Sequence, residues 1–263
     1  MAGRLRDKRC LIVGGITGLG LATARLFLEE GAKLVISGRS VDKGAAAVDA
    51  LHDVGQAHFF AGDAAQPVQV KLLFEHVMET LGGLDVLFHV AGISGRRHGD
   101  GPLHECTDEA WRTTIDANLK STFLTNRSAV QLYLQDGHGG VILNTASVLG
   151  FAPSPKFFDT IAYTATKGGI LAMSRLAAAS YAPEGIRINV IAPGFIDTPM
   201  AARAVQDPII RGYLRTKQPL GKGPGTDQDC AAAAVFLCSD EARFLTGVVL
   251  PVDGGWCVSE GQY

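Results

Sequence analysis

Residues 10–20 read CLIVGGITGLG, and this stretch decides the fold. A short apolar run leads directly into a glycine-rich turn, and apolar residues at helical spacing follow from Leu19 to Glu30. A strand, a tight turn and a helix in this order are typical of a phosphate-binding unit, because the glycines let the backbone turn sharply and let a pyrophosphate approach. The free N–H groups at the start of the helix then favour negative charge. The alternative is a turn that serves only helix–strand packing.

The rest of the chain continues the alternation of strands and helices. We expect strands at 10–13, 33–37, 58–61, 84–90, 141–146, 186–191 and 247–252. We expect helices at 19–30, 41–54, 66–81, 108–135, 160–182 and 227–238. Strands that alternate with helices through short links form a parallel sheet with right-handed crossovers. The predicted fold class is therefore α/β, a doubly wound, Rossmann-like parallel sheet with helices on both faces.

Nothing in the sequence divides the chain into parts. It has no Pro/Ser-rich linker, no charge run and no internal repeat, so we expect a single dinucleotide-binding and catalytic domain over residues 1–263. The least regular stretch is 194–226, which follows the sixth expected strand and contains Gly, Pro and residues of mixed polarity. A segment in that place lies at the ligand-binding edge of the sheet, which makes it a candidate substrate lid.

Composition and charge argue against several classes of function. A net charge of −2 leaves no electrostatic footprint for nucleic acid, so we expect no nucleic-acid partner. No apolar run approaches the roughly 20 residues that span a bilayer, and the N-terminus lacks a signal-peptide cleavage region. The five cysteines are scattered and odd in number, which indicates reduced thiols. We therefore expect a cytoplasmic protein with no membrane partner.

Tyr163 and Lys167 stand one helical turn apart, so a helix places both side chains on one face. A nearby ammonium lowers the pKa of a tyrosine, and the positive charge of an oxidised nicotinamide adds to this effect. Such a tyrosine can donate a proton to an alkoxide. Ser147 follows the fifth expected strand, where a parallel sheet presents residues to a ligand, and can hold the substrate oxygen. The alternatives are an exposed Tyr–Lys pair and a serine that caps backbone.

Asn118 lies in the middle of the expected helix 108–135, where asparagine is mildly unfavourable. A specific polar partner would explain it, for example a water that joins Lys167 to bulk solvent. On position alone, a satisfied surface asparagine is the simpler interpretation.

The chain contains four residues that resemble, in type and in order, the catalytic set of the short-chain dehydrogenase/reductase family: Asn118, Ser147, Tyr163 and Lys167. The glycine spacing in residues 14–20 resembles that family's first motif, TGxxxGxG. NVIAPG at 189–194 is similar to its N-x-x-x-PG motif, and the resemblance extends to VDGG at 252–255, so it covers nearly the whole chain. It implies an NAD(P)(H)-dependent oxidoreductase that interconverts an alcohol and a carbonyl, with Tyr163 as acid and base.

The resemblance also implies a cofactor site. Asp63 and Ala64 resemble the pair that meets the adenine, while Pro193, Ile196 and Thr198 resemble residues that line the nicotinamide and pyrophosphate. The full expected set is Gly14, Thr17, Gly18, Leu19, Gly20, Arg39, Asp63, Ala64, Ala91, Gly92, Tyr163, Lys167, Pro193, Ile196 and Thr198.

The second expected strand leads into Gly38, Arg39 and Ser40, with no acidic residue among them. An acid at this place accepts hydrogen bonds from the ribose 2′-OH and repels a 2′-phosphate. Arg39 offers a planar fork of donors to that phosphate, Gly38 leaves space for it, and Ser40 adds a hydroxyl. We therefore expect NADP(H) to be favoured. The alternative is that Arg39 stacks on the adenine or points to water, and that either cofactor is accepted.

The chain departs from the family pattern near its fourth expected strand and its first phosphate turn. Val13 replaces a threonine, so one side-chain hydrogen bond behind the turn is missing. His89 and Val90 replace two asparagines, and we expect His89 to be structural. The loop 95–101, GRRHGDG, is expected to be solvated surface, with contact to an anionic or polar substrate as the alternative.

Two further features concern the substrate and metals. Ser147 and Tyr163 are 16 positions apart, a few more than the resemblance implies, and the extra residues, FAPSPKFFDT at 151–160, fall beside the substrate. No metal is expected, because His98, Asp100 and His104 lack helical or hairpin spacing. Several aromatic or apolar residues indicate either a partly apolar substrate or simply core: Phe157, Phe158, Phe195, Met200, Tyr213 and Trp256.

Two rival functions remain open at this point. One is a non-redox enzyme of epimerase or dehydratase type, and the other is a nucleotide-sensing protein that has kept the fold. Retention of Ser147, Tyr163 and Lys167 argues against a sensor, which needs no acid–base set. The expected partners are a small alcohol or carbonyl substrate and further copies of the chain. A homotetramer is expected because helices 108–135 and 160–182 are apolar over more surface than a sheet covers, with residues 248–252 as a second contact.

Overall fold

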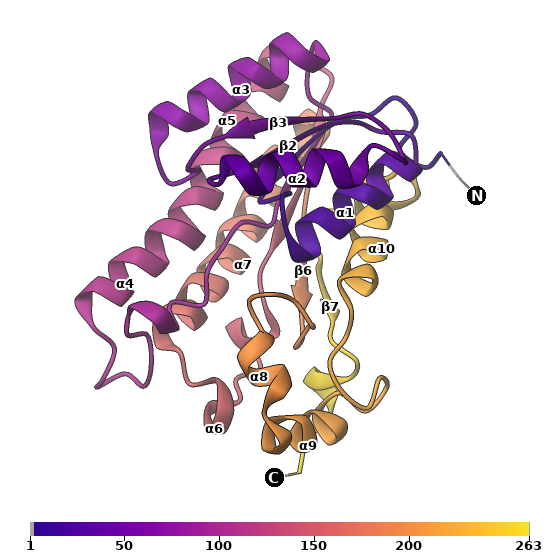
Figure 1. Cartoon of the computed structure of the whole chain (residues 1–263). Helices are drawn as coiled ribbons and strands as arrows, with labels where there is room; N and C mark the ends of the chain where they lie inside the picture. The colour runs from indigo at the N-terminus through magenta and orange to yellow at the C-terminus, as the bar shows by residue number, and fades with distance from the viewer. Residues whose placement is uncertain (1–2, 263) are drawn as a thin grey trace.

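In the computed structural model, which describes residues 3–262, seven strands form one parallel sheet between two layers of helices (Figure 1). The strands are β1 (Arg9–Val13), β2 (Lys33–Gly38), β3 (Ala57–Ala61), β4 (Val86–His89), β5 (Gly140–Thr145), β6 (Ile186–Pro193) and β7 (Val249–Val252). They lie in the order β3-β2-β1-β4-β5-β6-β7, and every neighbouring pair is parallel. The predicted doubly wound, Rossmann-like α/β fold is confirmed.

The strand order reverses between β1 and β4. After β1 the chain adds β2 and β3 on one side, and it then crosses over to build β4 to β7 on the other side. A doubly wound sheet leaves a crevice at such a point, outside the carboxyl ends of its strands. The register brings these ends level, since Val13 lies opposite both Ser37 and His89.

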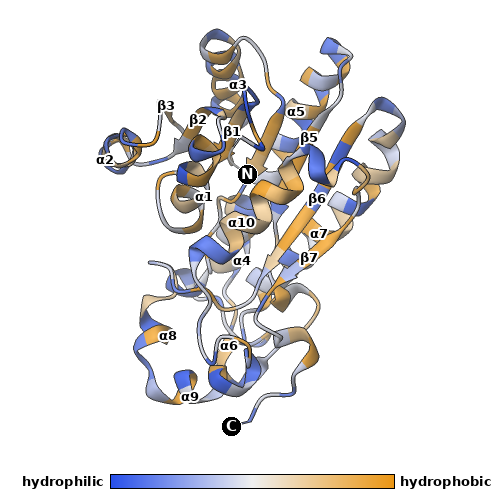
Figure 2. Cartoon of the chain, turned by 90° about the vertical axis from the view of Figure 1, so that its right-hand side faces the viewer, coloured by the Kyte–Doolittle hydropathy of each residue, from blue (hydrophilic) through white to orange (hydrophobic). Residues whose placement is uncertain are grey.

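The two helical layers follow from the alternation of side chains along the strands. On β1, Cys10 and Ile12 face one layer, whereas Leu11 and Val13 face the other. The first layer contains α1 (Gly18–Glu29), α2 (Val41–Leu51) and α10 (Asp227–Cys238). The second contains α3 (Pro67–Leu81), α5 (Ser121–Asp136) and α7 (Ile161–Tyr181). Figure 2 shows the apolar strands enclosed between these layers, with polar residues toward the loops.

The helix expected over 108–135 is not continuous. It consists of α4 (Asp108–Thr114), a π-helical turn at Ile115–Lys120 and α5. A π-helical turn accommodates an extra residue and changes which side chains face inward. Here the turn contains Asn118, which is fully buried.

The stretch 194–226 is more regular than its composition indicates. It contains α8 (Ala202–Gln206) and α9 (Pro208–Lys217). Asp207 caps the N-terminus of α9: its carboxylate accepts hydrogen bonds from the backbone N–H groups of Ile209 and Ile210. The extra residues before Tyr163 likewise form a short helix, α6 (Pro155–Phe158). Within residues 3–262, we find no helix that combines the length and the apolarity needed to cross a membrane.

Candidate active site

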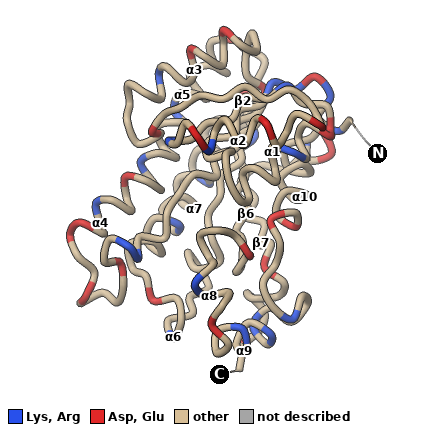
Figure 3. Tube along the Cα trace, in the orientation of Figure 1, with Lys and Arg blue, Asp and Glu red and all other residues tan. Residues whose placement is uncertain are grey.

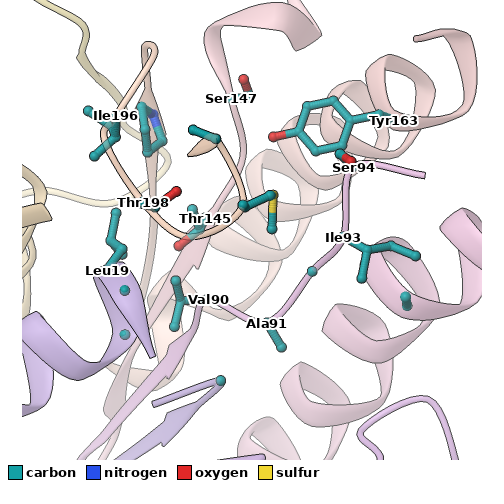
Figure 4. A pocket seen from close by; sticks show the side chains of 18 of the residues that line it. Leu19, Val90, Ala91, Ile93, Ser94, Thr145, Ser147, Tyr163, Ile196 and Thr198 are labelled. Carbon is teal, nitrogen blue, oxygen red and sulfur yellow. The ribbon is translucent and has the colours of Figure 1, made fainter. Parts of the chain in front are cut away.

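A cavity of about 450 Å³ opens at the carboxyl ends of the central strands. Its walls come from the β1–α1 turn, the segments that follow β2 to β6, and one face of α7. All fifteen expected cofactor residues line it, and so does Ser147. Figure 4 shows part of this wall, from Leu19 to Tyr163. Asn118 lies outside the lining residues.

The β1–α1 turn is packed so closely that two of its glycines are obligatory. Gly14 has φ +91°, and a Cβ there would lie 2.7 Å from the backbone nitrogen of Ala91. A Cβ on Gly20 would lie 2.1 Å from the carbonyl oxygen of Gly14. Beyond the turn, Thr17 precedes α1 without a side-chain cap, so the first N–H groups of the helix remain open to an anion. The turn therefore fits the pyrophosphate of a dinucleotide.

Val13 replaces the family's threonine without loosening the turn. Its side chain is buried in the core, with 2% of its surface exposed. Its carbonyl oxygen accepts hydrogen bonds from the N–H groups of Val90 and Ala91, both at 2.9 Å. Backbone bonds thus connect the ends of β1 and β4 where the threonine hydroxyl is missing.

Arg39 lies at the end of the cavity near β2 and is exposed. Among residues 3–262 its guanidinium has no hydrogen-bond or ion-pair partner. The space beside Gly38 is not free as expected, because a Cβ at that position would lie 2.4 Å from Cδ1 of Ile16. Gly38 therefore makes room for Ile16. The Ser40 hydroxyl accepts a hydrogen bond from Lys43 N at 3.4 Å and caps α2.

Ser147, Tyr163 and Lys167 converge on the cavity from two elements. Tyr163 projects from α7 with its hydroxyl directed into the cavity, and Ser147 lies on the strand-end segment across from it (Figure 4). Lys167 lies one turn further along α7, with Nζ 5.5 Å from the centre of the Tyr163 ring. Its ammonium donates a hydrogen bond to the carbonyl oxygen of Thr145 at 2.9 Å.

The electrostatics of this group differ from the expectation. Desolvation raises the pKa of Tyr163, and a hydrogen bond with Ser147 acts in the opposite direction. In the chain without cofactor the Tyr163 pKa is therefore raised and not lowered, because removal from water outweighs the hydrogen bond with Ser147. Lys167 itself is 4% exposed, and burial lowers its pKa to about 8.

Asn118 is a buried connector, and the interpretation as a surface asparagine is wrong. Its Oδ1 accepts a hydrogen bond from Ile93 N at 2.7 Å. Its Nδ2 donates to Ile93 O and to Thr166 Oγ1, both at 3.0 Å. The carboxamide thus joins the segment after β4 to α7, the helix of Tyr163 and Lys167.

His89 is a structural residue, as expected. Its ring is 1% exposed, with Nδ1 2.8 Å from Thr125 Oγ1 and Nε2 3.2 Å from Ser121 Oγ. Burial lowers its pKa to about 3, so the imidazole is neutral at physiological pH. It connects β4 to α5, and it does not line the cavity.

The loop 95–101 is solvated over only part of its length. Arg97 and His98 are exposed, but Asp100 is buried. The Asp100 carboxylate accepts hydrogen bonds from the backbone N–H groups of Ala162 at 3.0 Å and Tyr163 at 2.9 Å. It therefore caps α7 from a distant loop. In the described part of the chain, no three His, Cys, Asp or Glu side chains gather in a way that could hold a metal ion.

An aromatic cluster closes the end of the cavity beyond Tyr163. The Phe158 ring lies 5.6 Å from Trp256 and 5.5 Å from Phe195 between ring centres, and Phe157 lies 5.1 Å from Tyr213. Tyr213 packs behind the others and does not line the cavity. Sequence reasoning missed several polar residues of this wall, for which no motif gives a signal: Ser94, Thr160 and Arg203.

Comparisons with known proteins agree with this geometry. Residues 14–257 match a family model described as enoyl-(acyl carrier protein) reductase. The chain is 36% identical to the 2,5-dichloro-2,5-cyclohexadiene-1,4-diol dehydrogenase LinX of Sphingobium indicum, over 98% of this chain and 99% of that protein. It is also 36% identical to 3beta-hydroxysteroid dehydrogenase 1 of Eggerthella lenta, over 98% and 96%.

A solved structure of a short-chain type dehydrogenase/reductase from Mycobacterium ulcerans superposes with a TM-score of 0.90 at 30% identity, covering 97% of this chain and 92% of that one. These relatives are named dehydrogenases or reductases and give no support to a non-redox enzyme or a nucleotide sensor. The protein is an oxidoreductase that interconverts alcohols and carbonyls. The chain belongs to the short-chain dehydrogenase/reductase family.

Proposed function

We propose that Tyr163 is the acid and base of this oxidoreductase, that Ser147 holds the substrate oxygen with it, and that Lys167 supports the charge of Tyr163. The convergence of the two hydroxyls on a cavity that begins at the phosphate-binding turn supports this assignment. Asn118 is a positioning residue, since its carboxamide contacts α7 and not the cavity.

The chemistry of the residues accounts for both directions of the reaction. A nicotinamide cofactor held by the β1–α1 turn and by Pro193, Ile196 and Thr198 would supply the hydride for reduction of the carbonyl carbon or accept it from the alcohol carbon. In reduction, Tyr163 donates its proton to the substrate oxygen; in oxidation, it accepts the alcohol proton. Its raised pKa keeps the hydroxyl protonated, which is the form that reduction requires, whereas oxidation requires the phenolate. The Lys167 ammonium, 5.5 Å from the ring, then stabilises the phenolate that remains.

The cofactor that we propose is NADP(H). Arg39 supports the preference, because its unpaired guanidinium reaches the cavity beside β2, where no acid repels a 2′-phosphate. Wild-type kcat/KM is expected to favour NADP(H) over NAD(H) by about tenfold or more, and Arg39→Ala is expected to lose most of this ratio. Lys43→Ala, on the exposed part of α2, is the control. Equal use of both cofactors by the wild type would contradict the proposal.

The substrate that we propose is an alcohol or ketone on a ring. Two relatives are named for ring alcohols, a chlorinated cyclohexadiene diol and a 3β-hydroxysteroid. Apolar rings also pack well against an aromatic wall such as Phe157, Phe158 and Trp256. The segment 194–226 contributes Phe195, Met200 and Arg203 to the same wall, which supports its role as a lid.

The catalytic assignment is tested with Tyr163→Phe. This change removes the proton donor and keeps the ring, so kcat with a ring ketone should fall on the order of 10²–10⁴-fold while cofactor affinity changes little. Tyr181→Phe, at the far end of α7, is the matched control. Nicotinamide absorbance follows turnover. Near-normal turnover by Tyr163→Phe would remove Tyr163 from the acid–base role.

Assembly and location complete the proposal. We infer a homotetramer, supported by large apolar side chains exposed on α4, α5 and α7 and in the segment before β7: Trp111, Phe123, Leu134, Leu176 and Phe244. The cytoplasm is the proposed location, supported by five cysteines that are all unpaired.

A further inference from the structure

The charged residues that line the cavity are distributed unevenly. Arg39 and Asp63 follow β2 and β3, at the edge of the sheet, and Lys167 lies beside Tyr163. Arg96 and Arg203 line the opposite end, where the aromatic cluster lies. Among the described lining residues Asp63 is the only acid, so the lining of the end beyond Tyr163 contains two arginines and no carboxylate.

Arg96 and Arg203 reach this end from separate segments. Arg96 belongs to the loop after β4, and its guanidinium donates a hydrogen bond to the carbonyl oxygen of Phe157 at 3.1 Å. Arg203 belongs to α8, next to Ala204, which packs on the aromatic cluster. Figure 3 shows basic positions on α8 and on the segment that precedes α4. Both cations thus lie beside the aromatic wall, and they come from different parts of the chain.

Neither arginine has an ion-pair partner, since no carboxylate among residues 3–262 lies within ion-pair distance of either guanidinium. The Asp100 carboxylate accepts hydrogen bonds from the N–H groups of α7. Desolvation lowers the pKa of Arg96, the charge of Arg203 lowers it further, and Asp100 and Asp159 oppose this effect. Two guanidinium groups that feel each other's charge gain stability when an anion lies between them.

We propose that Arg96 and Arg203 bind a carboxylate of the substrate, so that the enzyme acts on a ring alcohol or ketone that also bears an acid group. The planar donors of the two arginines suit carboxylate oxygens, and the aromatic wall contacts the ring between acid and carbonyl. Tyr163 and Ser147 lie at the other end of that ring. This inference rests on the proposed function, which supplies the reacting carbonyl.

The test compares 3-oxocyclohexanecarboxylate with its carboxamide, two ketones that differ in charge and little in size. Wild-type kcat/KM should favour the carboxylate by about tenfold or more. The double variant Arg96→Gln/Arg203→Gln should bring the ratio close to one. Arg97→Gln removes the neighbouring charge, which is exposed as Arg96 and Arg203 are but does not line the cavity, and should keep the wild-type ratio.

Calorimetric binding of cyclohexanecarboxylate and cyclohexanecarboxamide separates this inference from the proposed reaction. Tighter binding of the carboxylate, lost in the double variant and kept in Arg97→Gln, supports the anion site even if neither ketone is reduced. Equal reduction of both ketones by the wild type would leave the proposed function intact and overturn the inference. A carboxylate preference that survives the double variant would overturn it as well.

Discussion

Lys167 is a charged side chain that the fold removes almost completely from water. Among residues 3–262 its ammonium has one hydrogen-bond acceptor, the carbonyl oxygen of Thr145. Burial lowers its pKa to about 8, so the folded chain binds the Lys167 proton less tightly than the unfolded chain does. Between this value and the ordinary lysine pKa, the unfolded state holds the extra proton, and stability therefore rises with pH.

The rise of stability with pH gives a prediction for the cofactor-free protein. The free energy of unfolding of the wild type, minus that of Lys167→Met, should rise by roughly 3 kcal/mol as the pH increases from 7 to 10.5. Urea unfolding at several pH values measures it, and other titrating groups cancel in the difference. Lys43→Met, on exposed α2, should give a flat difference. If the difference between the wild type and Lys167→Met does not change with pH, the pKa of Lys167 is not lowered in the folded protein.

At the scale of elements, α7 depends on side chains from outside the helix. Thr160 precedes it without a side-chain cap, and the Asp100 carboxylate takes that role from the loop after β4. Asn118, from the π-helical turn, contacts the same helix through Thr166. Both contacts hold the turn of α7 that begins with Tyr163, so the catalytic geometry depends on two segments far away in the sequence.

The cap can be tested with Asp100→Asn. The amide loses the negative charge and accepts through one oxygen only, so the free energy of unfolding should fall by about 1–2 kcal/mol. Because one bond holds the N–H of Tyr163, kcat of the folded protein should fall too, with KM for the cofactor unchanged. Asp108→Asn, exposed at the start of α4, is the control for charge at a helix start. An unchanged kcat would assign Asp100 a purely stabilising role.

At the scale of the whole molecule, the outer surface of the second helical layer carries large exposed apolar side chains. Leu176 on α7 is 72% exposed, and Phe123 on α5 is 45% exposed. Exposed apolar side chains that recur on adjacent helices are typical of a subunit interface. Phe244, fully exposed before β7, marks a second such surface.

Sedimentation at micromolar concentration should therefore show a tetramer. The double variant Phe123→Glu/Leu176→Glu should dissociate it to smaller species, because charges at a buried interface lose their water. Val41→Glu on α2, in the first helical layer and exposed to a similar extent, should leave the assembly unchanged. A wild-type protein that sediments only as a monomer would rule out the tetramer.

Several parts of the fold and site could be predicted from the sequence. The alternation of strands and helices depends on periodicity within each segment, which the sequence displays directly. The β1–α1 turn, the Tyr163–Lys167 pair and Ser147 at a strand end follow from short spacings and from the place of each strand end in a parallel sheet. These features involve neighbours in the chain, and the structure brings them to one cavity.

The remaining features depend on contacts between distant segments, which only the tertiary structure decided. Asp100 caps a helix 62 positions further along the chain, and Ile16 fills the space beside Gly38. Burial of the phenol reversed the expected pKa shift of Tyr163, since desolvation depends on everything packed around the group. Arg203 belongs to no motif, and it joins the cavity because α8 packs over the aromatic cluster. Local patterns carry no information about such packing.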